Sequence, residues 1–224
     1  MKNNSLREIA QKIREAKSVM LFPHVNPDGD TLGSCAALCK AFRKLGKETW
    51  ILLEDDIPAN LRFLDNGYCT NDEDKIPFPD ICMCVDCSSE DRFEKRAGKF
   101  VSGKTTICLD HHKTGEFKWD YNYIDPLEAA TAQIVFELIR EMGVEPDKEI
   151  GEAIFAAITT DTGNFQYSNT QRKSHLIAAE LYDWGVDCNS ISIQIYENVR
   201  MEKFMMRNRA METLKLIGEG RGAI

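Results

Sequence analysis

An apolar strand pattern, a polar loop and a helix pattern follow one another in residues 18–46, which read SVMLFPHVNPDGDTLGSCAALCKAFRKLG. The run SVMLF is short and continuously apolar, as in strands that are buried on both faces of a parallel sheet. The run TLGSCAALCKAFRKLG has the length of a helix, so a strand passes directly into a helix. Because this unit is typical of α/β proteins, it predicts a mostly parallel sheet flanked by helices.

The same alternation extends to both sides of this segment. A helix pattern precedes it at residues 6–16, and strand patterns follow at residues 48–54, 79–87, 104–112 and 122–125. The chain then changes to helix patterns at residues 125–143, 147–161, 171–185, 188–199 and 201–218. For the first of these helices we expect Asp125 as the N-cap, Glu128 in a capping box and Gly143 at the end.

Composition and charge narrow the possible functions. Of the 224 residues, 43% are hydrophobic and 29% are charged, as in ordinary globular proteins. Acidic side chains outnumber basic ones by 36 to 28, and the formal net charge is −8. This charge disfavours a long nucleic acid duplex as partner, because such binding relies on basic side chains. Residues 1–16 lack the apolar run of a signal peptide or membrane span, so we expect a cytoplasmic protein without membrane contact.

Eight cysteines are present, and their spacing forms no disulfide framework, which fits the expected cytoplasmic location. Cys84 and Cys87 have the C-x-x-C spacing of some zinc and redox sites. The sequence contains no second pair of this kind. We therefore interpret Cys82, Cys84 and Cys87 as small apolar residues of a buried strand.

Polar side chains gather where the predicted strands end. Seven such residues follow three strands: His24, Asp28 and Asp30 after the first, Asp86 after another, and Asp110, His111 and His112 after a third. Ligand sites in parallel α/β sheets lie beyond the carboxyl ends of the strands. Taken singly, each residue is explained as a turn or cap residue, as Asp30 would be at the start of a helix. Their recurrence on three strands favours one shared site.

A fourth contribution comes from the helix pattern that ends at Asp161, although a helix stop at Asp161-Thr162-Gly163 explains that residue equally well. Three of the 4 histidines lie in these clusters. Imidazole and carboxylate ligands suit two divalent metal ions, for which we expect Mn²⁺, with Co²⁺ or Mg²⁺ as alternatives. A metal pair activates water and stabilises displacement at phosphorus, so we predict phosphoester or phosphoanhydride hydrolysis.

The ordered segments HVNPDGDTLGS, VDCSS, LDHH and ITTDTGNF resemble the four motifs of the DHH phosphoesterase family, and the resemblance spans about Leu21 to Thr170. The resemblance implies a ligand set for each metal: His24, Asp28 and Asp86 for one, and Asp30, Asp86, His111 and Asp161 for the other. Asp86 would then bridge the two ions. The resemblance also implies catalytic roles for His112, as a phosphate contact or acid/base group, and for Asp110, which would orient its neighbours.

Further candidate substrate contacts are less specific. Asn26, Ser34 and Asn164 lie within or beside the motifs, and Arg92 belongs to the partly basic segment DRFEKRAGK. Arg92 is explained equally as a charge on a solvated helix face. These four residues join His112 as expected contacts to substrate.

Within the family, the motifs look most similar to the bifunctional oligoribonuclease and phosphoadenosine-phosphate (PAP) phosphatase branch. This resemblance implies a small nucleotide or a short oligonucleotide as substrate. Three alternatives stay open: a pyrophosphatase or exopolyphosphatase, a cyclic or linear dinucleotide phosphodiesterase, and a metal- or nucleotide-binding module without turnover. A homodimer also stays open.

Relatives in this branch carry a smaller C-terminal domain with a glycine-rich, histidine-containing motif, and the present sequence has no such segment. We expect a DHH domain at residues 1–195 and a linker helix at residues 196–218. Residues 219–224, EGRGAI, would then begin a C-terminal substrate-binding domain that is otherwise missing. On this basis the DHH domain alone is expected to bind metals and to turn over substrate poorly.

Overall fold

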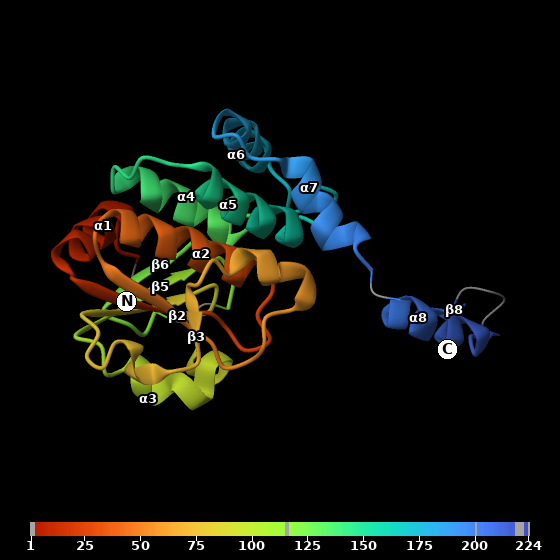
Figure 1. Ribbon diagram of the computed structural model, residues 1–224, viewed down its shortest axis with the longest axis horizontal. Coiled ribbons are helices and arrows are strands. Elements are labelled where there is room, and N and C mark those ends of the chain that lie inside the picture. Colours follow the sequence, from red (N-terminus) through yellow and green to blue (C-terminus); the bar gives the residue numbers. More distant parts are fainter. Residues whose placement is uncertain (1–2, 115–116, 200, 218–221, 224) are drawn as a thin grey trace.

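The computed structural model describes residues 3–114, 117–199, 201–217 and 222–223. Six parallel strands form one sheet in the order β3-β2-β1-β4-β5-β6 (Figure 1). Their bounds are β1 Ser18–Phe22, β2 Glu48–Leu52, β3 Cys69–Thr70, β4 Ile81–Val85, β5 Thr105–Asp110 and β6 Tyr121–Ile124. The prediction of a mostly parallel sheet is confirmed. Strand β3 was not predicted, because two residues are too few to show a pattern.

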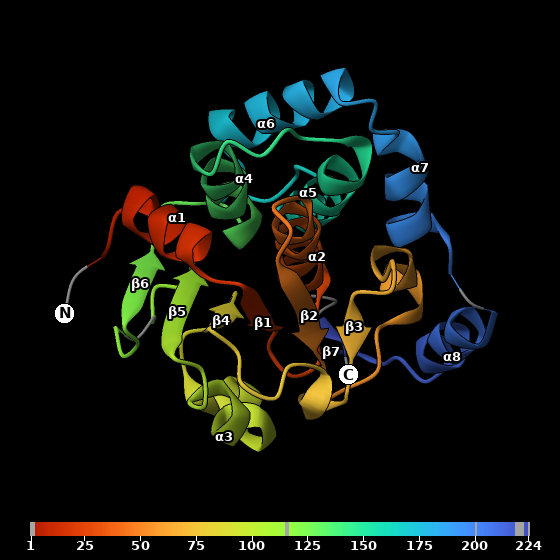
Figure 2. The same cartoon turned by 60° about the vertical axis from the view of Figure 1, so that its left-hand side comes forward.

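Helices cover both faces of the sheet (Figures 1 and 2). One face packs against α1 (Leu6–Glu15), α2 (Gly29–Lys44), α4 (Thr131–Glu141) and α5 (Lys148–Asp161). The other packs against η3 (Glu90–Arg96) and α3 (Ala97–Phe100). Side chains of one strand alternate between the two cores, with Met83 in the first and Cys84 in the second. This double coverage explains why the strand sequences are apolar throughout.

The remaining elements complete the chain. They are η1 (Ala59–Leu64), η2 (Glu73–Lys75), α6 (Arg172–Asp183), α7 (Cys188–Ser192), η4 (Ile193–Glu197), α8 (Met201–Glu212) and an antiparallel pair of β7 (Leu216–Ile217) and β8 (Gly222–Ala223). Figure 1 shows α8 and this pair apart from the sheet and its helices. None of the described helices has the length and apolar character needed to cross a membrane.

The cysteines are free thiols, and Cys82, Cys84 and Cys87 are buried in the core on the α3 side of the sheet. Their interpretation as packing residues is therefore supported by position. Cys84 Sγ also donates to the carbonyl oxygen of Ile107 on the neighbouring strand, at 3.5 Å. The C-x-x-C spacing thus belongs to a strand and its following turn inside a hydrophobic core.

Two predicted helix boundaries were wrong. The helix expected from Asp125 begins at Thr131, because Asp125 instead closes a turn in which it accepts from the N–H groups of Leu127 and Glu128. The last helix ends at Glu212 and not at residue 218. The hydroxyl of Thr213 donates to the carbonyl oxygen of Ala210, and residues 216–217 form a strand. Residues 218–221 and 224 lie outside the described ranges, so the expected start of a further domain at 219–224 stays a prediction.

Helices α2 and α5 cross in very close contact at Gly33. A Cβ added to Gly33 would lie 2.4 Å from the carbonyl oxygen of Ala153 and 2.9 Å from the Cβ of Ala157. Neither atom is the end of a flexible side chain, so one of the two helices would have to move. Because α2 carries Asp28 and Asp30 and α5 carries Asp161, this contact also fixes the distance between their two ends.

We predict that Gly33→Ala lowers the free energy of unfolding by about 1–3 kcal/mol, the usual cost of overpacking a tight core. Gly98→Ala is the matched control, because nothing lies within 4 Å of a Cβ added there. Chemical denaturation of the two variants and the parent measures the difference. Equal stability of Gly33→Ala and Gly98→Ala would contradict the close contact of α2 with α5.

Candidate metal centre

The carboxyl edge of the sheet brings all four predicted clusters together. His24 follows β1, Asp86 follows β4, and Asp110 ends β5 directly before His111. Asp28 and Asp30 lie at the start of α2, and Asp161 is the last residue of α5. Three overlapping groups of these residues could each hold a metal ion: His24, Asp28 and Asp86; Asp30, His111 and Asp161; and Asp86, His111 and His112.

The first group is built around the imidazole of His24. Its Nε2 lies 3.4 Å from Asp28 Oδ2 and 3.6 Å from Asp86 Oδ2. Its Nδ1 lies 2.7 Å from the carbonyl oxygen of Val25. In the neutral ring Nδ1 then carries the hydrogen and donates to that carbonyl, which leaves the lone pair of Nε2 facing the two carboxylates. This is the tautomer that binding a metal through Nε2 requires.

The second group repeats this arrangement around His111. Its Nε2 lies 3.2 Å from Asp161 Oδ2 and 3.8 Å from Asp30 Oδ2. Its Nδ1 lies 3.1 Å from the carbonyl oxygen of Glu128, so the neutral ring again presents Nε2 to the carboxylates. Both histidines are therefore oriented for the same chemistry.

Asp86 lies between the two groups. Its Oδ2 faces His24 and its Oδ1 faces His111, at 3.6 Å in each case. The residue is buried, and its backbone φ of 63° lies in the left-handed region that non-glycine residues rarely adopt. Thr131 Oγ1 donates to Asp86 Oδ1 at 2.7 Å and holds the carboxylate. Asp86 thus has the placement of a carboxylate shared by two ions.

Asp30 is fully buried and is held by the start of α4. The N–H of Thr131 donates to Asp30 Oδ2 at 2.6 Å, and the N–H of Ala132 donates to Oδ1 at 3.0 Å. Ser34 Oγ donates to the same carboxylate at 3.2 Å. A carboxylate that accepts the first free N–H groups of a helix acts as its cap, which explains why α4 begins at Thr131. Thr131 was missed by sequence reasoning, because a threonine at a helix start has several ordinary explanations.

The cluster carries more negative charge than its buried position favours. Burial, followed by the neighbouring carboxylates of Asp86 and Asp161, raises the pKa of Asp30 well above its usual range. Burial disfavours the charged form of His24, but Asp28 and Asp86 outweigh it and raise the pKa of His24 to about 10. Burial likewise lowers the pKa of His111, but its carboxylate neighbours, chiefly Asp161, outweigh burial and raise this pKa to about 10. The carboxylates therefore attract positive charge strongly.

This donor set fits divalent metal ions. It combines imidazole nitrogens with carboxylate oxygens and contains no thiolate, which suits Mn²⁺, Mg²⁺ or Co²⁺ better than a structural zinc site. The orienting carbonyls behind both histidines supply the support that metal ligands usually have. Positive ions at this edge would relieve the repulsion among the carboxylates.

His112 differs from the other two site histidines because its ring is half exposed. Its Nδ1 lies 2.7 Å from Oδ1 of the buried Asp110, which also accepts from the backbone N–H of His112. Asp110 raises the pKa of His112, against a smaller opposing effect of burial. Nδ1 of His112 also lies 3.7 Å from Asp86 Oδ1, so the ring borders the candidate metal ligands.

The other expected substrate contacts have different positions. Asn26 and Arg92 are exposed beside the loop after β1: the N–H of Asn26 donates to Asp55 at 2.8 Å, and the carbonyl of Arg92 accepts from Val25 at 2.7 Å. Asn164 is exposed after α5 and has a positive φ of 57°. Ser34 is fully buried against Asp30, so its position suits support of that carboxylate and not contact with substrate.

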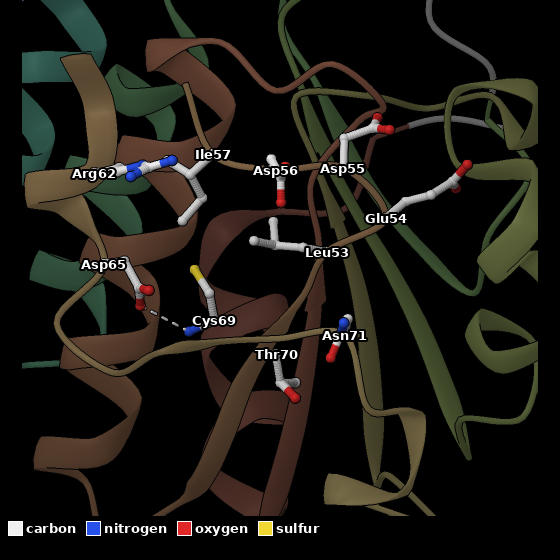
Figure 3. Close-up of a pocket in the computed structure, with 10 residues that line it drawn as sticks. All are labelled: Leu53, Glu54, Asp55, Asp56, Ile57, Arg62, Asp65, Cys69, Thr70 and Asn71. Carbon is white, nitrogen blue, oxygen red and sulfur yellow. Dashed lines mark hydrogen bonds between the residues drawn. The ribbon is translucent and has the colours of Figure 1, made fainter. Parts of the chain in front are cut away.

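A cavity of about 440 Å³ lies beside the cluster, beyond the carboxyl ends of β2 and β3 (Figure 3). Its walls include the aliphatic side chains of Leu53 and Ile57 and the charged side chains of Asp56 and Arg62. Asp55, which also lines it, accepts the N–H of Asn26 from the loop that carries His24 and Asp28. None of the metal-ligand candidates lines this cavity, so it adjoins the centre without containing it.

Two relatives match this chain over most of its length. The bifunctional oligoribonuclease and PAP phosphatase NrnA of Thermus thermophilus is 36% identical over 184 residues, which cover 81% of this chain and 55% of the relative. The protein of the same name from Bacillus subtilis is 25% identical over 209 residues, covering 90% and 65%. The chain thus spans roughly half to two thirds of these relatives.

A solved structure shares the fold. The exopolyphosphatase-related protein of Bacteroides fragilis superimposes with a TM-score of 0.87 at 22% identity, over 94% of this chain and 65% of that one. The family model described as DHH family, N-terminal domain, matches residues 18–158. This range contains every candidate ligand except Asp161, which follows it by three residues. The chain therefore belongs to the DHH family, a family of phosphoesterases, as the four sequence motifs predicted.

Proposed function

We propose that this chain is the metal-binding domain of a phosphoesterase that uses two divalent ions, in the first place Mn²⁺, to hydrolyse short oligoribonucleotides and PAP. One observation carries the proposal: the carboxylate of Asp86 lies between the two ligand groups, with one oxygen 3.6 Å from His24 Nε2 and the other 3.6 Å from His111 Nε2. The names of the Thermus and Bacillus relatives support the substrate class. Two metal ions held there would supply an activated water and would stabilise the oxygens of the phosphoryl group during displacement.

Some residues of the chain hold the candidate metal ligands in place, and others are placed for proton transfer. His24 and His111 present Nε2 because backbone carbonyls hold their Nδ1 atoms, and Asp86 stays between them because Thr131 holds it. His112 is more exposed and is oriented by Asp110, so it can contact a phosphate oxygen or donate a proton to the leaving oxygen. Asp110 acts on substrate only through His112.

The surroundings of the centre support a nucleotide over inorganic polyphosphate. The neighbouring cavity offers the aliphatic side chains of Leu53 and Ile57 to a nucleobase or ribose, and a polyphosphate would gain nothing from them. Among the described residues that line it, Arg62 is the one cationic side chain, and it stands among carboxylates such as Asp56 and Asp65. Several further phosphate groups would meet repulsion there, whereas a single nucleoside would not.

A direct substrate comparison tests the proposal. The chain is loaded with Mn²⁺ and incubated in excess over PAP, di- to pentaribonucleotides, a cyclic dinucleotide and pyrophosphate, so that a single slow turnover is detected. Chromatography of the products should show hydrolysis of PAP and the short oligoribonucleotides and little release of phosphate from pyrophosphate. Hydrolysis of pyrophosphate alone would contradict the nucleotide assignment.

We predict that Asp86→Asn lowers Mn²⁺-dependent hydrolysis by at least roughly 10²- to 10³-fold, as loss of one essential electrostatic group does elsewhere. The substitution keeps the size of the side chain but removes the charge that both ligand groups share. Asp120→Asn is the matched control, because Asp120 bonds Thr106 at the start of β5, far along the strand from the centre. The measurement compares the initial rates of the parent and the two variants. Circular dichroism checks that all three proteins are folded. Equal loss in both variants would remove the special role of Asp86.

A second prediction concerns pH. Asp110 stabilises the protonated ring of His112 and raises its pKa, so the proton-donating form persists to higher pH in the parent. In Asp110→Asn this stabilisation is lost, and the alkaline limb of the kcat profile should move to lower pH. Metal affinity should change little, because Asp110 is not a candidate ligand and the His112 ring that it orients belongs to neither of the groups built around His24 and His111. Superimposable alkaline limbs in the two proteins would show that His112 is not the proton donor.

A further inference from the structure

The loop between β6 and α4, residues 125–130, carries the carbonyl group on which His111 rests. Nδ1 of His111 lies 3.1 Å from the carbonyl oxygen of Glu128. This loop lies outside helix and strand, so regular backbone bonding does not fix the direction of that carbonyl. The orientation of the His111 ring therefore depends on the contacts that hold residues 127–129 in place.

Amide side chains hold the carbonyls on both sides of Glu128. Gln171 Nε2 donates to the carbonyl oxygen of Leu127. Asn169 Nδ2 donates to the carbonyl oxygen of Ala129 at 3.1 Å and also to that of Asp161 at 3.0 Å. Asn169 thus ties the loop behind one candidate ligand, His111, to the backbone of another, Asp161.

The side chain of Glu128 is held as well. Lys173 Nζ pairs with its Oε1, and Gln133 Nε2 donates to its Oε2 at 2.5 Å. Lys173 also pairs with Glu137 on α4 at 2.5 Å. The side chain of Glu128 is 13% exposed, so its pairing is sheltered from solvent more than an ordinary surface ion pair. With its side chain and both flanking carbonyls fixed, the carbonyl of Glu128 is left to point at His111.

We propose that Asn169, Gln171 and Lys173 are positioning residues that fix the His111 ring and thereby set the affinity of the second metal site. Lys173 lies in the first turn of α6, and Gln171 and Asn169 come just before this helix, so we call the three residues the α6 brace. The brace acts through the loop, since its side chains bond Leu127, Glu128 and Ala129. The inference rests on the proposed two-metal function for its metal, but it is independent of the substrate.

The first metal site needs no such support. His24 rests on the carbonyl of Val25, its own neighbour in sequence, and Val25 is fixed by its bond to Arg92. Loss of the α6 brace should therefore weaken the site at His111 and leave the site at His24 intact. Partners behind a metal-binding histidine typically contribute about 10- to 100-fold to metal affinity.

The test uses Lys173→Met in the metal-free chain, titrated with Mn²⁺ and followed by electron paramagnetic resonance and calorimetry. We expect one of two binding steps to weaken by about 10-fold or more and the other to stay unchanged. Lys173→Arg, which keeps the charge, should restore the weakened step. Lys148→Met is the control, because Lys148 pairs with Glu152 on α5 at 3.5 Å and its side chain is 60% exposed.

Asn169→Ala provides a second variant at an exposed position, in case Lys173→Met folds poorly. Nitrogen NMR of the histidine rings adds a readout that loss of global stability would not move: both brace variants should alter the Nδ1 and Nε2 signals of His111 and leave those of His24 unchanged. Unchanged binding steps in both variants, or equal weakening of both steps, would overturn the proposal. If the parent shows two Mn²⁺ steps but hydrolyses no nucleotide, the proposed function fails and the brace can still be judged.

Discussion

Repulsion among the carboxylates of Asp28, Asp30, Asp86 and Asp161 is the constraint on which the rest of this structure depends. Four such groups within reach of two histidines are unfavourable unless donors and cations compensate. The chain supplies the donors itself: the start of α2 bonds Asp28, the start of α4 bonds Asp30, and Thr131 bonds Asp86. Where these two helices begin is therefore decided by the site as well as by local sequence. The remaining negative charge is what bound metal ions would neutralise.

The two ligand groups of the centre differ in how they are supported. The difference depends on how far apart their residues lie in the sequence. His24, Asp28 and the carbonyl of Val25 belong to one short loop, so the first ligand group is largely assembled by local sequence. His111, Asp30 and Asp161 come from three distant segments, and only tertiary packing brings them together. The close crossing of α2 and α5 at Gly33 serves this second group, because each helix delivers one of its carboxylates. His112 stands on the more open side of the centre.

Sequence patterns predicted what depends on short-range order. The strands β1, β4 and β5 were recognisable because both their faces are buried, and their polar ends marked His24, Asp86 and Asp110. The start of α4 was mispredicted because its cap, Asp30, lies 101 residues away in sequence from Thr131. The same reason hid the role of Asn169, whose partner Ala129 lies 40 residues away in sequence. A two-residue strand such as β3 depends on pairing with its neighbour and carries no signal of its own.

The central claim is that this edge of the sheet holds two metal ions that share Asp86. Anomalous diffraction at the manganese absorption edge, from crystals of the chain grown with Mn²⁺, tests it most directly. The account predicts two anomalous peaks about 3.5–4 Å apart, one beside His24 and Asp28 and the other beside His111 and Asp161, with Asp86 between them. A single peak, or peaks away from Asp86, would contradict it.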